Sequence, residues 1–212
     1  MVADAGRTRG AKLTTVRVGN EPATRVRDPE RASKILDAAA DLFAANGFHT
    51  VSLAEVGQAA GIVGSGIYRH FSSKYAVLIS LLEDAMTQLL ADADDILAEG
   101  ADSAVTMRRL IHSQIEFCLD RRRHVQLYRH ESNALQPEDA RRLRRMQRRY
   151  NEDWTTTLLE LRPELSESAA RALVYAAIAA IQSSVTYDSG LSRDDQIDIL
   201  SAVAETCLHT VW

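Results

Sequence analysis

Three parts of the sequence hold side chains whose types and spacing could carry chemistry. Residues 52–74 bring together hydroxyl, phenol, imidazole and cationic groups, which commonly donate hydrogen bonds to phosphate oxygens. Residues 141–149 contain six arginines, whose guanidinium groups bind carboxylates and phosphates. A third set recurs every six residues and could supply metal ligands: His112, Cys118, His124 and His130.

Catalysis and metal binding have little support in these patterns. Six residues correspond to about 600° of helical rotation, so members of the His/Cys set fall on different faces of a helix. His130 and Glu131 begin a metalloprotease-like pair, but Ala134 stands where the H-E-x-x-H motif needs its second His. Residues 64–66 are Gly-Ser-Gly without the Lys and Ser/Thr of a phosphate-binding loop. We therefore expect no enzyme, no metal site and no cofactor.

Residues 52–71 predict two short helices joined by a tight glycine turn. Ser52 and Glu55 form the S-x-x-E capping box that starts the first helix. The second helix is expected at about 63–71, with Ile67 turned toward the core and the opposite face open for a partner. This is the layout of a helix-turn-helix, whose second helix enters the major groove of DNA.

The residues after this turn also carry a resemblance to a known family. Gly61-Ile62, the run Ile67-Tyr68-Arg69-His70-Phe71 and Ser73-Lys74 resemble the end of the DNA-binding domain in the TetR (tetracycline repressor) family. The likeness covers residues 28–78. It implies a homodimeric, ligand-responsive regulator of transcription, usually a repressor. The DNA-binding residues expected from the likeness and from the layout are Ser52, Gly64, Ser65, Gly66, Tyr68, His70 and Lys74.

These positions are expected to play different parts. Tyr68, His70 and Lys74 match family positions that reach phosphates, and Ser52 at its helix start can donate to a phosphate as well. Gly66 stands where the family often has Thr or Ala, so contact there is made by the backbone or is missing. Ser65 is then the expected reader of a base.

The distribution of charge supports DNA binding at one end of the chain. The net charge of −4 argues against a nucleic-acid binder when it is taken alone. Residues 1–74, however, hold ten Lys/Arg against seven Asp/Glu, whereas the rest holds 15 against 22. Residues 1–27 include six basic residues and show no apolar periodicity, so we expect a disordered arm. That arm either tethers DNA or is a leader with incidental charge.

Apolar periodicity predicts helices through the remainder of the chain. We expect an all-α protein of about nine helices, with a helix-turn-helix domain at 28–73 and an effector-binding and dimerisation domain at 74–212. No apolar run approaches the length of a membrane span, and the start does not resemble a signal peptide. Cys118 and Cys207 lack the spacing of a disulfide framework, so a cytoplasmic location is expected.

Apolar stripes of four predicted helices can converge on an effector pocket, although the same residues would also suit an ordinary core. An apolar cavity with a few polar groups suits a lipophilic small molecule. A sharper hypothesis is an acyl-coenzyme A with its phosphates on Arg145 and Arg149, and its alternative is an arginine face that is solvated and paired with acids. The residues expected to line the pocket are Met86, Leu110, Ile115, Cys118, Tyr128 and Trp154.

The last two predicted helices are expected to form the dimer interface. Alanine on several faces allows close helix approach, although such a helix can also be buried within its own chain. For the protein as a whole, the competing interpretation is a helical interaction module whose helix-turn-helix packs against another protein instead of DNA. The interface residues expected are Ala177, Ala180, Leu200 and Ala204.

Overall fold

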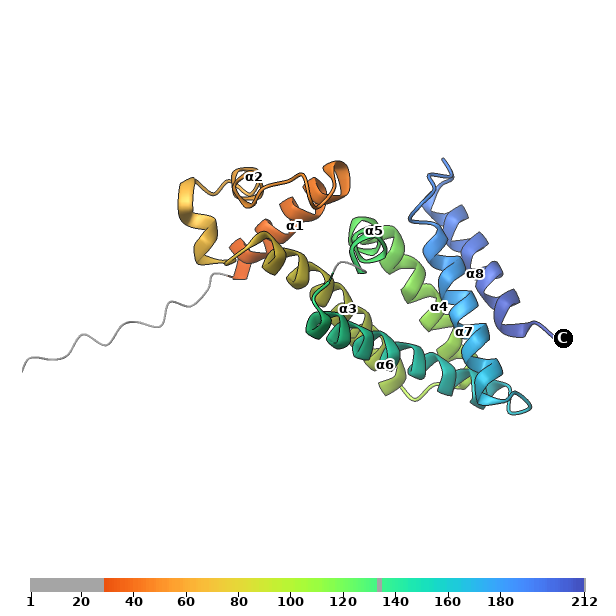
Figure 1. The fold of residues 1–212 in the computed structure, drawn as a ribbon. Coiled ribbons are helices and arrows are strands. Elements are labelled where there is room, and N and C mark those ends of the chain that lie inside the picture. Colours follow the sequence, from red (N-terminus) through yellow and green to blue (C-terminus); the bar gives the residue numbers. More distant parts are fainter. Residues whose placement is uncertain (1–28, 133–134, 212) are drawn as a thin grey trace, which may run out of the picture.

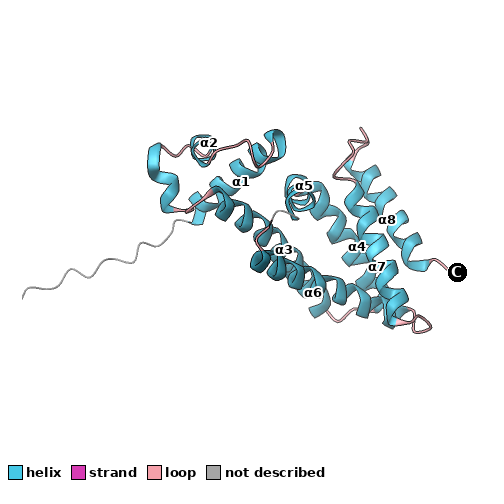
Figure 2. Ribbon diagram, in the orientation of Figure 1, coloured by secondary structure: helices cyan, strands magenta, loops and turns pink. Residues whose placement is uncertain are grey.

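The computed structural model describes residues 29–132 and 135–211, and every regular element in these ranges is a helix (Figure 1, Figure 2). The all-α prediction is confirmed for this part of the chain. The arm expected at residues 1–27 lies outside the described residues. The elements are α1 (Pro29–Asn46), α2 (Leu53–Ala59), the 3₁₀ helix η1 (Gly64–Arg69), α3 (Lys74–Ala98), α4 (Ser103–Asp120), α5 (Arg122–Glu131), α6 (Pro137–Leu161), α7 (Glu167–Ser183) and α8 (Arg193–His209).

Short polar side chains mark where most of these helices begin. The hydroxyl oxygens of Ser52, Ser73, Ser166 and Ser192 each accept a hydrogen bond from a backbone N–H in the first turn. The carboxylate of Asp102 does the same for α4. These bonds satisfy donors that have no partner within the helix, so the start of each helix is set locally.

The first three helices, α1, α2 and η1, form a unit that we name the head. Its core includes Ile35, Val56 and Ile67, which have no exposed surface. The rings of Phe43 and Phe48 meet edge to face there, with their centroids 5.2 Å apart. The long helix α3 begins at the head and continues along α6, so it contacts helices of both parts (Figure 1).

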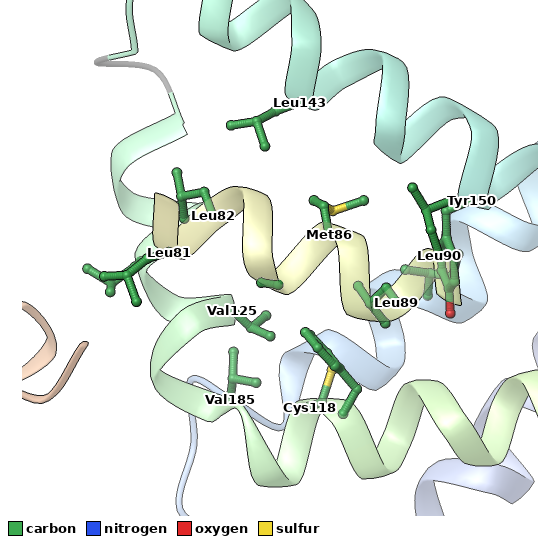
Figure 3. Close-up of a cluster of buried hydrophobic side chains, with 14 of the residues drawn as sticks. Leu81, Leu82, Met86, Leu89, Leu90, Cys118, Val125, Leu143, Tyr150 and Val185 are labelled. Carbon is green, nitrogen blue, oxygen red and sulfur yellow. The ribbon is translucent and has the colours of Figure 1, made fainter. Parts of the chain in front are cut away.

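The helices α3 to α8 form a second unit that we name the body. α6 lies along α3, α7 packs against α8, and α4 contacts α3, α6, α7 and α8. Figure 3 shows side chains of several helices around α3, with Leu143 and Tyr150 from α6, Cys118 from α4 and Val125 from α5. One continuous cluster of buried apolar side chains includes residues of both head and body. The two units therefore share a core.

The short helix α5 lies between the head and the other helices of the body (Figure 1). Arg123 of α5 forms an ion pair with Asp41 of α1. The imidazole of His49 lies 3.6 Å from the carboxylate of Glu131 at the other end of α5. Leu127 between them is buried. The body thus contacts the head through α5 as well as through α3.

The second helix of the helix-turn-helix differs from the α-helix expected at 63–71. It is a 3₁₀ helix of six residues, and the bond from the Gly66 N–H to the Val63 carbonyl is long, at 3.4 Å. Gly64 has a φ of +60°, outside the helical region. Glycine is a poor former of α-helix, and two glycines in six residues explain the difference. We name residues 63–69 the recognition segment.

Candidate nucleic-acid interface and ligand pocket

The start of α2 is built as the capping box predicts. The Glu55 N–H donates to the Ser52 hydroxyl oxygen at 3.2 Å, and the Ser52 N–H donates to the Glu55 carboxylate at 2.7 Å. The bond from the Ser52 backbone, followed by the Ser52 side chain, lowers the pKa of the Glu55 carboxyl. The Ser52 side chain is exposed and its hydroxyl hydrogen is still available. A phosphate contact from Ser52 remains a prediction.

Glycines hold the recognition segment close to the rest of the head. A Cβ added at Gly66 would lie 2.7 Å from Cγ2 of Ile62, which is a clash. A Cβ added at Gly57 would lie 3.2 Å from Cβ of Ile67. Packing in the head therefore favours glycine at position 66, whether or not this residue contacts DNA.

The outer surface of the recognition segment includes one residue that sequence reasoning missed. Val63 is 93% exposed, Tyr68 is 58% exposed, and Ser65 and Gly64 are exposed as well. An α-helix over 63–71 would place Val63 on the buried side with Ile67, four residues later. The extended backbone of Val63, with φ −85° and ψ 134°, instead precedes the helix and leaves the side chain in solvent.

Lys74 and His70 are less open than expected. The Lys74 ammonium donates to the carbonyl oxygens of Phe48 at 2.6 Å and His49 at 3.0 Å, and it lies 4.6 Å from the centroid of the Phe48 ring. Lys74 thus ties the start of α3 to the segment after α1, and one of its three donors is left for a phosphate. His70 is half-buried. DNA contacts from both residues remain predictions.

A groove beside the recognition segment adds positive charge to this surface. Its volume is about 580 Å³, and its lining includes Ser65 together with the cations Arg31, Lys34 and Arg69. None of the described residues that line it is acidic. Cations beside an exposed hydroxyl suit a phosphodiester backbone.

The body contains a cavity of about 40 Å³ where α3, α4, α5, α6 and α7 meet. Met86 and Tyr128, two of the residues expected in the pocket, line it. The other four are buried but do not line this cavity, as the alternative of an ordinary core expects, because apolar stripes serve a core and a pocket equally well. Their place in an effector pocket stays a prediction. The four residues are Leu110, Ile115, Cys118 and Trp154.

Neutral polar side chains make up half of the wall of this cavity, and sequence reasoning missed all of them except Tyr128. Gln114, His124 and Asn151 are all buried. The Gln114 amide nitrogen donates to the sulfur of Cys118 at 3.3 Å. The sequence could have indicated one of them, because Gln114 lies four residues after Leu110 and so falls on the inward face of α4.

The cavity is uncharged near neutral pH. None of the described residues that line it is Asp, Glu, Lys or Arg. Burial, followed by the nearby Arg121, lowers the pKa of His124. Burial also raises the pKa of Tyr150, and it raises the pKa of the adjoining Cys118 thiol to about 11. All three side chains are therefore neutral.

A second cavity of about 220 Å³ adjoins the first and includes Arg144. The two cavities share Tyr128 and Gln147 in their walls. The Tyr128 hydroxyl donates to the Gln147 side-chain oxygen at 3.0 Å, so a single hydrogen bond joins the two shared side chains. The two cavities therefore lie on either side of this hydrogen bond, and the second one has a cation in its wall.

The arginines of α6 fall into a paired and an unpaired group. Arg149 donates to both carboxylate oxygens of Asp94, at 2.6 and 2.7 Å, and Arg142 pairs with Glu83 and Asp139. The Asp94 pair already neutralises Arg149, so it is less suited to the anion contact expected of it. Four other arginines are exposed, share one side of α6 and have no ion pair among the described residues: Arg141, Arg144, Arg145 and Arg148.

The residues expected at the dimer interface lie in different environments. Ala177 and Ala204 have no exposed surface within their own chain, so a second chain cannot cover them, and the prediction is wrong for these two. Close packing of α7 on α8 uses these alanines inside the chain. Ala180 and Leu200 are half-buried. The large apolar side chains that the same two helices expose are Tyr175 at 54%, Ile199 at 50% and Val203 at 42%.

The described residues form neither a cluster of metal ligands nor a membrane-spanning helix. No group of three or more His, Cys, Asp or Glu side chains among them could hold a metal ion. No helix in residues 29–132 and 135–211 has both the length and the apolar character to cross a bilayer.

Two family models match the chain, one over the head and one over the body. Residues 35–81 match bacterial regulatory proteins of the tetR family. Residues 100–186 match the C-terminal domain of tetracyclin repressor-like proteins. Together the two matches span more than half of the chain. Both describe regulatory proteins, so the prediction that the chain is not an enzyme is confirmed.

Individual relatives agree with the two family matches. The HTH-type transcriptional repressor KstR2 of Rhodococcus jostii is 33% identical over 86 residues, which are 41% of this chain and 42% of that protein, less than half of its length. A TetR-family regulator from Bordetella parapertussis superposes with a TM-score of 0.77 at 20% identity, covering 86% of this chain and 96% of that one. AibR in complex with isovaleryl coenzyme A and operator DNA superposes with a TM-score of 0.70 at 15% identity, covering 81% and 96%. With a helix-turn-helix head joined to a helical body and both parts matched, this chain belongs to the TetR family of bacterial regulatory proteins.

Proposed function

We propose that the protein is a transcriptional repressor that binds operator DNA as a homodimer in the bacterial cytoplasm and releases it when a small effector enters the body. The observation that carries this proposal is the recognition segment, where Val63, Ser65 and Tyr68 are exposed beside a basic groove. Major-groove recognition requires such outward side chains, and the groove supplies the attraction to phosphates. The likeness to the repressor KstR2 agrees with this role.

A homodimer is supported by the outer face of α7 and α8. Tyr175, Ile199 and Val203 expose apolar surface on two helices that pack side by side. Large apolar side chains that stay exposed on neighbouring helices suit an interaction site. Two copies of the same patch make a self-complementary interface, and a dimer can place two heads in successive major grooves.

Control by an effector is supported by the position of α5. His124, Val125 and Tyr128 of this helix line the cavity in the body. Arg123 and Glu131 of the same helix pair with residues of the head. The cavity has room for only a few water molecules, so a larger effector must separate the surrounding helices. A displacement of α5 would then change how the head is held.

A coenzyme A thioester is the effector class that we propose. An acyl group would widen the inner cavity, and the phosphates of the coenzyme would lie on the unpaired arginine side of α6, near Arg144 and Arg145. Arg144 lines the second cavity, which shares wall residues with the inner one. The bound isovaleryl coenzyme A in the structurally similar AibR supports the same class.

The experiment that tests DNA binding begins with selection of genomic fragments on the purified protein. Sequencing the retained fragments defines an operator, and fluorescence anisotropy at several salt concentrations then measures affinity. We expect retention of a common sequence and a steep linear fall of log affinity with log salt, because phosphate contacts release counterions. A helical module that packs against another protein would retain no common sequence, and its weak DNA affinity would favour no fragment.

Effector control is tested on the operator complex. We expect an acyl-coenzyme A to release the DNA and to raise the melting temperature of the protein, since a ligand that binds only the folded state stabilises it. Arg144→Glu and Arg145→Glu should weaken both effects, and added salt should do the same. Arg149→Glu is the control, because Arg149 is held by Asp94. The affinity for an uncharged effector should not change with any of the three substitutions.

A further inference from the structure

We propose that the inner cavity selects an effector whose buried acyl chain carries a hydroxyl group, and that Gln114 binds this group. The inference rests on the proposed function, in which the effector is a coenzyme A thioester, and it specifies the acyl part. A plain saturated chain is the alternative that it excludes.

The central observation is an unsatisfied polar group in the wall of the cavity. Gln114 is 1% exposed, and its side-chain oxygen has no hydrogen-bond partner among the described residues. Its amide nitrogen is engaged with the sulfur of Cys118, which extends from α4 toward α3 in Figure 3. Turning the amide over exchanges the positions of this oxygen acceptor and the nitrogen donor. In either orientation, one polar end of Gln114 is left for another molecule.

Among the buried side chains with a polar atom that lacks a partner, Gln114 is the one that lines the cavity, and Gln147 provides the contrast. Gln147 also lines the cavity, but its side-chain oxygen accepts the hydrogen bond of Tyr128. Gln114 has no such partner although it is the more deeply buried of the two. A buried polar group without a partner destabilises a fold, so its presence on an otherwise apolar stripe calls for a ligand group that pairs with it.

The remaining wall indicates which polar group this is. Asn151 and His124 add further neutral hydrogen-bonding side chains, and no described residue of the wall is charged. A carboxylate would be buried there without a counter-charge, which is costly. A hydroxyl is neutral and both donates and accepts, so it pairs with Gln114 in either amide orientation. Sites that bind a hydroxyl strongly reject the analogue that lacks it, because their own polar group is then left unpaired.

The test compares three coenzyme A thioesters of equal chain length on the full-length protein by calorimetry: octanoyl, 3-hydroxyoctanoyl and 3-oxooctanoyl. We expect the hydroxy form to bind at least about tenfold more tightly than the plain form. The 3-oxo group accepts hydrogen bonds but cannot donate one. The 3-oxo form should therefore match the affinity of the hydroxy form only if the Gln114 nitrogen faces the cavity. In Gln114→Met, which keeps length and removes polarity, the plain form should bind at least as tightly as the hydroxy form. Equal binding of the plain and hydroxy forms to the unmodified protein overturns the inference and leaves the proposed coenzyme A effector standing.

A second measurement does not depend on the choice of ligand. Without any thioester, Gln114→Met should melt at the same or a higher temperature than the unmodified protein, because it removes an unpaired buried group. Gln147→Met is the matched control and should melt lower, since it leaves the Tyr128 hydroxyl without its partner. A lower melting temperature for Gln114→Met would show that Gln114 is satisfied within the fold, for instance by a bound water, and would overturn the inference. If no thioester binds at all, the proposed effector class fails together with this inference.

Discussion

The side chains that the recognition segment offers to a base are short and few. Ser65 provides a hydroxyl, Val63 provides two methyl groups, and Gly64 and Gly66 provide none. Tyr68 can reach a phosphate. Ser65 pairs with several bases, so it discriminates weakly. Val63 is the aliphatic side chain that the described recognition segment exposes most, at 93%, so we expect it to meet a thymine methyl in the major groove.

Contact between Val63 and a thymine methyl makes the first prediction. Replacing one thymine of the operator by uracil removes that methyl, and the affinity should fall about fourfold, or by about 0.8 kcal/mol for one buried methyl-sized group. In Val63→Ala the same uracil replacement should have no effect. Anisotropy with a set of uracil-substituted operators measures both. Tyr68→Phe is the control, because the loss of a phosphate contact weakens every sequence alike. A uracil effect that persists in Val63→Ala would show that another residue reads the methyl.

The buried imidazole of His124 makes the second prediction, a dependence of stability on pH. Burial lowers its pKa in the folded protein below the ordinary value of 6.5, so the unfolded chain binds the proton first as the pH falls. The contribution of His124 to stability is complete above about pH 6.5 and is lost as the pH falls toward the lowered pKa. Melting temperatures between pH 7.5 and 5 should therefore decline, and His124→Gln should reduce the decline.

The control for this pH effect is His112→Gln. The side chain of His112 is 53% exposed and also lies in the body. This variant should follow the unmodified protein. A His124→Gln variant with the unmodified pH profile would contradict the prediction.

At the scale of the elements, local signals predicted more than packing signals did. Capping side chains such as Ser52 act within one turn, so the starts of helices can be predicted from neighbouring residues. The 3₁₀ form of the recognition segment was missed although its two glycines are a local signal against an α-helix. The clash that a Cβ at Gly66 would make with Ile62 appears only in the packed head. The wall of the cavity was equally hidden. Gln114 and Leu110 lie on the same inward stripe, and only the arrangement of five helices separates cavity from core.

The proposed coupling through α5 makes the third prediction. Arg123→Asp would replace the attraction to Asp41 by repulsion and loosen the head from the body. We expect the effector concentration for half-release of operator DNA to rise about twofold to thirtyfold, since residues between coupled sites change coupling by about 0.5 to 2 kcal/mol. Effector affinity measured without DNA should be unchanged. Anisotropy and calorimetry measure the two quantities separately.

The charge swap provides the control for this prediction. The pair Asp41→Arg with Arg123→Asp restores opposite charges at the same two positions and should restore release. Both side chains are more than half exposed, so neither single change should prevent folding. If the swap is as impaired as Arg123→Asp alone, the ion pair is not what couples the two units.

For the whole molecule, the choice of dimer surface could not be made from composition. Alanine occurs on nearly every face of α7, and each face could pack against α8 or a second chain. In the structure, Ala177 and Ala204 are used within the chain, so an arginine at either would disrupt the fold and say nothing about the dimer. The outward positions carry the larger side chains Tyr175, Ile199 and Val203, which supply more apolar area to a partner.

The dimer surface makes the fourth prediction. Tyr175→Arg and Val203→Arg each place a charge where the second chain would exclude water, so both variants should be monomeric in light scattering. Operator affinity should fall by roughly a hundredfold, because two linked heads bind two half-sites far more tightly than one head binds one. Val105→Arg is the matched control: Val105 is 38% exposed but belongs to α4, and its variant should stay dimeric and bind DNA. Circular dichroism should show the same helix content in all three variants. If Tyr175→Arg and Val203→Arg remain dimers, the two heads are joined through another surface, and the apolar face of α7 and α8 must be assigned to a different partner.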